Sequence, residues 1–380
     1  MNPFSRCSLK RRFLELIVGG IILSLFWGWP HRIAASGWKQ AKGPWKWSFP
    51  RDHGAHPDFR TEWWYFTGNL KEDAGKPFGY QLTFFRQGVL QKAKNSINPW
   101  SIRDLYLAHF TLTDVSAGQF WYAERISRKG PGLADASERG LDVRLLNWTA
   151  SMEEGLIRIG ARHQQVELSL ELSPRKPIVY HGQNGLSRKG PREGQASYYT
   201  SFTDLATKGV IRPPSSPSAI RVRGKSWFDQ EFGSNQLASN QVGWDWFSLH
   251  LSDGQDLMIY FLRRNDGSLE PTSSGTLVDP TGKTTHLRLP DINVEVLNHW
   301  KSPKTGGRYP SRWRIRVPNS GIELLVNPLV AAQELITEAS TGVVYWEGAV
   351  AGKGKSSNRD VNCEGYVEMT GYAGALDGLF

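Results

Sequence analysis

The chain has 380 residues, a formal net charge of +10 and two cysteines, and its length suffices for two domains that each bury a core. Its basic residues are scattered, which excludes nucleic acid as a partner because that function needs a dense basic patch. The 16 Trp, 39 Gly and 21 Pro favour many strands joined by tight turns over helices.

Residues 1–36 have the pattern of a secretory signal. Four basic residues between positions 6 and 12 precede an apolar stretch at 17–29, which is short for a bilayer span, and small residues follow at 34–36. We therefore predict a signal peptide and an exported, periplasmic protein, with an uncleaved N-terminal membrane anchor as the alternative. After cleavage only Cys363 would remain, so we predict no internal disulfide.

Residues 61–70 form the first predicted strand, because aromatic and β-branched side chains suit a pleated surface. On a strand Glu62 and Trp64 share one face, and Trp63 lies on the other. A strand that is apolar on both faces is either buried on both, or has one face on a core and the other in a ligand cavity. Residues 78–86 form the second strand of this hairpin.

The hairpin occurs twice in the sequence. Residues 243–251 match residues 62–70, with Trp244 in place of Trp63 and Trp246 in place of Tyr65. The next strands end in Phe-Phe-Arg and Phe-Leu-Arg, and a third element also matches in order. We interpret this as duplication of a whole β domain, and predict two antiparallel barrels or sandwiches over residues 37–195 and 196–380.

Two carboxylates, Asp229 and Glu231, lie two positions apart and would face the same side of a strand together with Trp227. Close carboxylates in an aromatic setting repel each other and lose hydration, which raises the pKa of one and makes it a proton donor near neutral pH. Alternatively, both accept hydrogen bonds from buried Arg or backbone groups where the two domains meet. The sequence leaves both interpretations open.

Two other carboxylates, Glu62 and Asp245, are embedded in aromatic strands and need partners if they are buried. Arg60, Arg86 and Arg263 are the candidate partners, and we expect buried ion pairs.

His53 and His56 have a spacing that permits metal coordination, but no third ligand lies nearby. We therefore predict no metal and no cofactor, and interpret this segment as a loop that packs over a cavity mouth. His109 is predicted to be a core histidine with its hydrogen bonds satisfied. The Trp-rich strands are expected to form the cores, with ligand lining as a second role for some of them.

Residues 49–65, which end in Glu-Trp-Trp-Tyr, resemble the opening of the AttH/CrtC-like proteins, which include carotenoid 1,2-hydratases. The resemblance continues through residues 79–86, 227–231, 243–247 and 365–368 and spans nearly all of the chain after residue 36. It implies two consecutive lipocalin-like β domains. Members of this group include hydratases acting on polyene isoprenoids, fungal pericyclases and proteins encoded beside ABC transporters.

The resemblance implies that Asp229 protonates a terminal alkene. In the hydratases an upstream His-x-Trp assists, whereas residues 198–202 contain no histidine here, and Trp227 replaces a Tyr. We predict Asp229 and Glu231 as catalytic residues. The residues predicted to bind the ligand are Glu62, Trp64, Tyr199, Trp227, Trp244, Asp245 and Trp246; those with a structural or lid role are His53, His56, Arg60 and Arg86.

Three functions are consistent with the sequence. The first is a hydro-lyase that hydrates a C=C bond of a hydrophobic isoprenoid. The second is a non-catalytic lipid or polyketide carrier that serves an ABC transporter. The third is a carbohydrate-active protein, for which two carboxylates only two residues apart are poorly placed to flank a sugar. Whether the protein is an enzyme stays open at this stage.

Overall fold

The computed structural model describes residues 37–91, 101–234, 237–374 and 376, which contain strands and three short 3-10 helices. The 3-10 helices are η1 (Arg51–His53), η2 (Leu289–Asp291) and η3 (Pro318–Ser320). In this part of the chain no helix is long and apolar enough to cross a membrane. The predicted signal segment, residues 1–36, lies outside the described residues. The predicted all-β fold class is confirmed.

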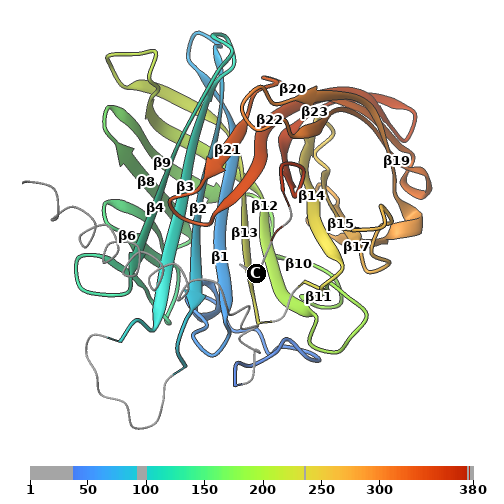
Figure 1. The fold of residues 1–380 in the computed structure, drawn as a ribbon. Helices are drawn as coiled ribbons and strands as arrows, with labels where there is room; N and C mark the ends of the chain where they lie inside the picture. The colour runs from blue at the N-terminus through green and yellow to red at the C-terminus, as the bar shows by residue number, and fades with distance from the viewer. Residues whose placement is uncertain (1–36, 92–100, 235–236, 375, 377–380) are drawn as a thin grey trace, which may run out of the picture. The chain divides into compact units, whose positions relative to one another are not determined.

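The first sheet is antiparallel, with the strand order β4-β3-β2-β1-β13-β12-β9-β8-β7-β6-β5, and β10 and β11 pair with β12 (Figure 1). Its strands are β1 (Thr61–Glu72), β2 (Pro77–Gly88), β3 (Asp104–Asp114), β4 (Gln119–Arg128), β5 (Ala134–Ala136), β6 (Asp142–Leu145), β7 (Trp148–Glu153), β8 (Leu156–His163), β9 (Val166–Pro174), β10 (Val179–Tyr180), β11 (Leu186–Arg188), β12 (Ala196–Arg212) and β13 (Ile220–Gly233).

The second sheet is also antiparallel, with the order β17-β16-β15-β14-β23-β22-β20-β19-β18, and β21 pairs with β22. Its strands are β14 (Gln241–Leu251), β15 (Asp256–Arg264), β16 (Ser274–Val278), β17 (Thr284–Arg288), β18 (Asn293–Lys301), β19 (Arg308–Val317), β20 (Ile322–Pro328), β21 (Glu334–Thr337), β22 (Val343–Ser356) and β23 (Arg359–Thr370).

The two sheets share one topology, which confirms the predicted duplication. In each, a four-strand meander begins with the aromatic strand, β1 or β14, and the last strand returns to pair with that strand. The predicted domain boundary, at 195/196, differs from the boundary between the sheets, which falls between Gly233 and Gln241. The reason is that β12 and β13 pair with each other and with β9 and β1 of the first sheet. The polar residues 181–195 therefore connect strands of one sheet.

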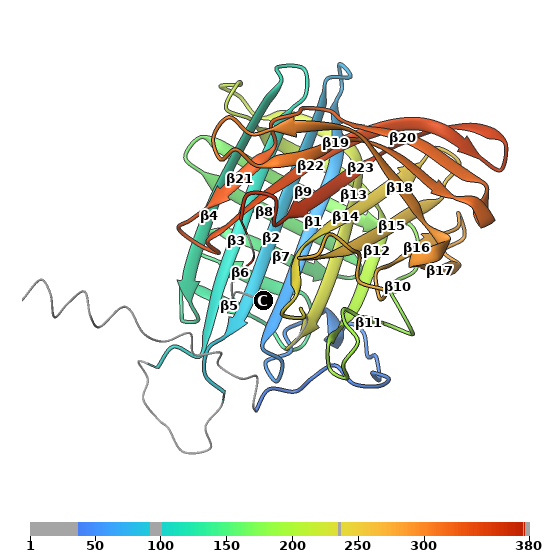
Figure 2. The same cartoon turned by 45° about the vertical axis from the view of Figure 1, so that its right-hand side comes forward.

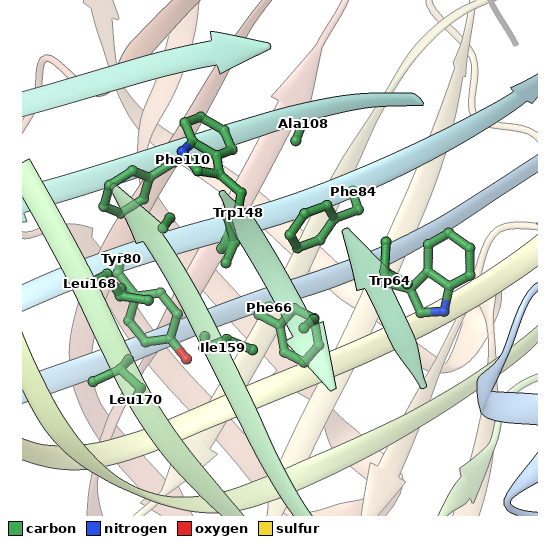
Figure 3. Close-up of a cluster of buried hydrophobic side chains, with 14 of the residues drawn as sticks. Trp64, Phe66, Tyr80, Phe84, Ala108, Phe110, Trp148, Ile159, Leu168 and Leu170 are labelled. Atoms are coloured by element: carbon green, nitrogen blue, oxygen red, sulfur yellow. The ribbon is translucent and has the colours of Figure 1, made fainter. Parts of the chain in front are cut away.

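The first sheet curls so that strands far apart in its order face each other across a core. Figure 3 shows this core, in which the rings of Phe110 on β3 and Trp148 on β7 lie 5.8 Å apart. Phe66 stacks on Phe228 of the neighbouring β13 at 4.4 Å. Trp64 is fully buried on this same face, and its indole N–H donates to the carbonyl oxygen of His53.

A buried ion-pair network closes one end of the first sheet. The Glu62 carboxylate accepts hydrogen bonds from the backbone N–H of His56 at 2.8 Å and from its ring at 2.7 Å. The Arg86 guanidinium contacts Glu62 at 3.4 Å and Asp104 at 2.9 Å and donates to two carbonyl oxygens. The predicted pairing of Glu62 with Arg86 is confirmed, whereas Arg60 bonds Ser234 through its backbone N–H.

This network generates a stability prediction. Arg86→Met should lower the free energy of unfolding by about 3–5 kcal/mol, because it leaves buried carboxylates without their cation. Arg158→Met is the matched control, since Arg158 is half exposed and its ion pairs are 3.4–3.5 Å long; it should cost about 1 kcal/mol or less. Urea unfolding measures both, and equal effects would contradict a structural role for the buried pair.

Candidate active site between the two sheets

A cavity lies between the sheets and is lined by residues of β1, β2, β22 and β23, among others. The strands β22 and β23 cross the face of β1 and β2 (Figure 2). The cavity has a volume of about 100 Å³. The sheets approach closely beside it at Gly79, where a Cβ atom would lie 2.6 Å from the Tyr366 hydroxyl. The cavity is therefore a feature of how the two sheets pack on each other.

The two copies of the duplicated hairpin supply opposite walls of the cavity. Trp63 and Tyr65 line it from β1, and their sequence counterparts Trp244 and Trp246 line it from β14. The rings of Tyr65 and Trp246 meet edge to face, with centroids 5.1 Å apart. Each sheet therefore contacts the other with the same face of its duplicated strand, β1 or β14. The side chains on this face make the cavity wall mainly aromatic.

Asp229 on β13 is the buried carboxyl group at the centre of the first wall. Its Oδ1 accepts hydrogen bonds from the Ser201 hydroxyl and from the Trp227 indole N–H, and its Oδ2 accepts from the Tyr199 hydroxyl at 2.5 Å. Because Oδ1 already has two donors and Oδ2 has one, the free lone pair for a proton is on Oδ2.

Burial raises the pKa of Asp229 to about 7, and the nearby Glu231 charge adds to this, while the hydrogen bonds from Ser201, Tyr199 and Trp227 partly offset it. In a population of molecules, a large fraction of the Asp229 carboxyl groups therefore carries a proton near neutral pH. The predicted proton-donor chemistry is available at this position.

Glu231, the other predicted catalytic carboxylate, has a different environment. It forms a 2.9 Å ion pair with Lys189 and also accepts a hydrogen bond from Ser197. The Lys189 ammonium lies over the ring of Tyr260 at 4.1 Å. Both carboxylates face the cavity as their spacing predicted, but only Glu231 of the two forms an ion pair among the described residues. The alternative prediction of hydrogen bonds from buried Arg or backbone groups differs from this, because the partners of Glu231 are the Lys189 and Ser197 side chains.

A histidine contacts the Asp229 network from a segment remote in sequence. His181 Nε2 lies 2.6 Å from the Ser201 hydroxyl, and His181 Nδ1 lies 2.9 Å from the Thr276 hydroxyl. Since Ser201 donates to Asp229, His181 donates through Nε2 and accepts at Nδ1. Burial lowers the pKa of His181 to about 3, so the ring is neutral. Nothing in the sequence links this loop residue to Asp229.

Glu368 on β23 lines the cavity from the second sheet and was not predicted as a site residue. It accepts a hydrogen bond from the Trp244 indole N–H at 2.9 Å. Burial raises the pKa of Glu368 to about 7, and the charges of Asp229 and Glu231 contribute. The sequence signal that could have found it is its place in the second repeat, since Glu368 pairs with Trp246 as Asp229 pairs with Tyr65.

Of the predicted ligand-binding residues, Tyr199, Trp244 and Trp246 line the cavity. Trp227 is buried behind it and reaches the site through its hydrogen bond to Asp229. Asp245 points to Arg263 at 3.2 Å and to the Tyr372 hydroxyl, as its predicted ion pair requires.

Glu62 and Trp64 do not line this cavity, because strand alternation turns them to the opposite face of β1 from Trp63. None of the four residues predicted to have a structural or lid role borders the cavity. His56 and Arg86 belong to the Glu62 network, the His53 carbonyl oxygen accepts from Trp64, and Arg60 bonds Ser234. His109 does line it, with its ring nitrogens bonded to the hydroxyls of Tyr345 and Ser340.

Comparisons with known proteins identify the family of this chain and a fold that it shares with a hydratase. A family model described as AttH-like matches residues 40–372. A crystal structure from Nitrosomonas europaea assigned to AttH shares 34% sequence identity and a TM-score of 0.78, over 88% of this chain and 99% of that chain. Kievitone hydratase from Nectria haematococca has a TM-score of 0.66 at 15% identity, over 89% and 97%, which shows a shared fold. No curated protein matches the sequence.

The Asp229 environment generates a prediction about stability. The folded-state pKa of about 7 exceeds the ordinary 3.8, so the folded protein binds more protons than the unfolded chain between those values. The free energy of unfolding therefore falls as pH rises through this window, by on the order of 4 kcal/mol. Asp229→Asn should remove this contribution, and thus gain stability relative to the wild type at pH 8 compared with pH 4.

Urea unfolding at a series of pH values measures the difference. The control is Asp135→Asn, whose carboxylate is 67% exposed and should leave the pH dependence of the wild type unchanged. Parallel curves for the wild type and Asp229→Asn would show that Asp229 does not hold a proton in the folded protein.

Proposed function

Because this chain belongs to the AttH-like family, we propose that its inter-sheet cavity binds a hydrophobic, isoprenoid-like ligand and that Asp229 begins hydration of a C=C bond there by donating a proton. The observation that carries this proposal is Asp229 itself. Its carboxyl group is buried, forms no ion pair among the described residues, and borders an aromatic cavity. An ordinary exposed aspartate would be ionised at neutral pH and could not donate.

The other residues of the cavity fit the same reaction. Protonation of an alkene produces a carbocation, and the faces of Trp63, Trp244 and Trp246 can stabilise a positive charge through their π electrons. Tyr199, Ser201 and Trp227 fix the orientation of the Asp229 carboxyl group. The volume of the cavity suits one end of an extended ligand, so we expect the reacting double bond to be near a chain end.

We assign to His181 the part of the histidine that residues 198–202 lack. It reaches the carboxyl group through Ser201 rather than directly, and it comes from the β10–β11 connection. We assign it a positioning role, since its neutral ring donates to Ser201 and thereby directs the Ser201 hydroxyl at Asp229 Oδ1.

Export to the periplasm through residues 1–36 is part of this proposal, with retention by an N-terminal anchor as its alternative. A carrier that passes an unchanged lipid or polyketide to an ABC transporter would use the same cavity without the proton transfer. The two functions differ in the fate of the ligand, which the following experiment measures.

Purified residues 37–380 should add one water to a hydratable probe, and Asp229→Asn should reduce turnover by roughly 10²–10⁴-fold while the fold is retained. The probes are lycopene, a polyene with terminal C=C bonds, and kievitone. We choose kievitone because kievitone hydratase has the same fold. Mass spectrometry detects the added water, and tryptophan fluorescence measures binding independently.

The control variant is Asp114→Asn, which changes a buried aspartate paired with Lys76 on the first sheet, outside the cavity. It should keep the wild-type turnover. Saturable binding with an unchanged ligand mass would reject the hydratase proposal in favour of the carrier. Wild-type turnover by Asp229→Asn would reject Asp229 as the donor.

A further inference from the structure

Glu368 is a second acid that borders the cavity and forms no ion pair among the described residues. It lies at the position that the duplication makes equivalent to Asp229. In the first sheet Asp229 pairs with Tyr65 of β1 and with Ser201 of β12. In the second sheet Glu368 pairs with Trp246 of β14 and with Glu347 of β22. Since Tyr65 and Trp246 are counterparts in the repeat, the two sheets present acids from matching sites to one cavity.

Glu368 differs from Asp229 because another carboxyl group, that of Glu347, lies beside it on the neighbouring strand. Glu347 is fully buried and lies directly opposite Glu368 in the β22–β23 ladder, where side chains of paired residues project from the same face. Burial, together with the Glu368 charge, raises the pKa of Glu347 well above its ordinary value. Its Oε1 accepts a 2.7 Å hydrogen bond from Tyr65, and its Oε2 has no hydrogen-bond partner among the described residues.

These contacts assign different protonation states to the pair. Two adjacent buried carboxyl groups do not both ionise, because their charges repel in a medium of low dielectric. Each member of the pair accepts one hydrogen bond that stabilises its charged form, Glu347 from Tyr65 and Glu368 from Trp244. Only Glu368 borders the cavity, whereas an ionised Glu347 would leave its fully buried Oε2 without a partner among the described residues. Glu347 therefore keeps its proton, and Glu368 is the member of the pair that can exchange one with the cavity.

We infer that Glu368 is the general base of this site, which takes the proton from the water that adds to the carbocation. This inference rests on the proposed hydration, in which Asp229 is the acid. An acid on one wall and a base on the other are what addition of water across a double bond requires.

The step balances without any further reactant. The π electrons of the C=C bond take the proton of Asp229, whose O–H bond breaks as a C–H bond forms. A lone pair of water then forms the C–O bond with the cationic carbon. The oxonium loses one proton to the Glu368 carboxylate, and the product is the substrate plus one water. Exchange of protons with solvent returns Glu368 to its charged form and Asp229 to its neutral form.

The charges around Glu368 favour Asp229 as the acid and Glu368 as the base. Asp229 and Glu231 face it from the first sheet, and Glu347 adjoins it on β22. Lys189 forms its ion pair with Glu231 at 2.9 Å and also interacts with the Asp229 charge. Because Asp229 and Glu368 interact, ionisation of one holds the proton on the other, which keeps one acid and one base available near neutral pH. Turnover should therefore show a bell-shaped pH profile centred near neutrality.

The test is turnover of lycopene and kievitone by Glu368→Gln in residues 37–380. Glutamine keeps an acceptor for the Trp244 N–H, so the fold and probe binding should be retained. Turnover should fall by roughly 10²-fold, and the residual activity should lose the acidic limb of the pH profile. Glu368→Asp, which restores a carboxylate, should recover part of the lost turnover.

Glu364→Gln is the matched control, because Glu364 lies on the same strand but does not line the cavity; it should behave as the wild type. Full turnover by Glu368→Gln, with Asp229→Asn inactive, would overturn the base and leave the proposed function intact. Equal losses in Glu368→Gln and Glu368→Asp would also overturn the base, since they would indicate a packing role. Absence of turnover by the wild type would overturn both proposals together.

Discussion

The packing of two aromatic hairpin faces against each other is the contact on which the rest of this structure depends. The hairpins β1–β2 and β14–β15 are copies of one sequence element, and each presents the same strand face to the other sheet. Aromatic rings fill most of the interface, as the edge-to-face contact of Tyr65 with Trp246 illustrates. Polar groups placed between these faces are removed from water, and their chemistry follows from that removal.

Buried acids in this protein fall into two groups with different consequences. Glu62, Glu231 and Asp256 each have a cation within 3.4 Å, and these pairs connect segments of the structure. Asp229 and Glu368 have hydrogen-bond donors but form no ion pair among the described residues. A buried charge without a cation is costly, so burial raises the pKa of both carboxyl groups to about 7, where each can exchange a proton.

Hydrogen bonds between the sheets hold the cavity walls in place. Lys176 of the first sheet reaches Asp256 of the second at 2.6 Å, and Tyr65 donates to Glu347 at 2.7 Å. The Trp246 indole N–H donates to the Tyr199 hydroxyl, which itself donates to Asp229. The second sheet thus contributes to the position of the Asp229 carboxyl group on the first sheet. A substitution in one wall of the cavity should therefore alter the geometry of the other wall.

The sequence by itself determined the all-β class, the duplication and the shared face of Asp229 and Glu231, because strand alternation and repeated aromatic motifs are local patterns. It could also predict the pairing of Glu62 with Arg86, since a buried carboxylate in an apolar strand requires a cation. The tertiary structure decided which face of β1 meets the cavity, so Trp63 lines it and Trp64 does not. It alone brought His181 to Asp229 through Ser201, and it alone brought Glu368 of the second sheet to the same cavity, since folding joins residues that are far apart in the sequence.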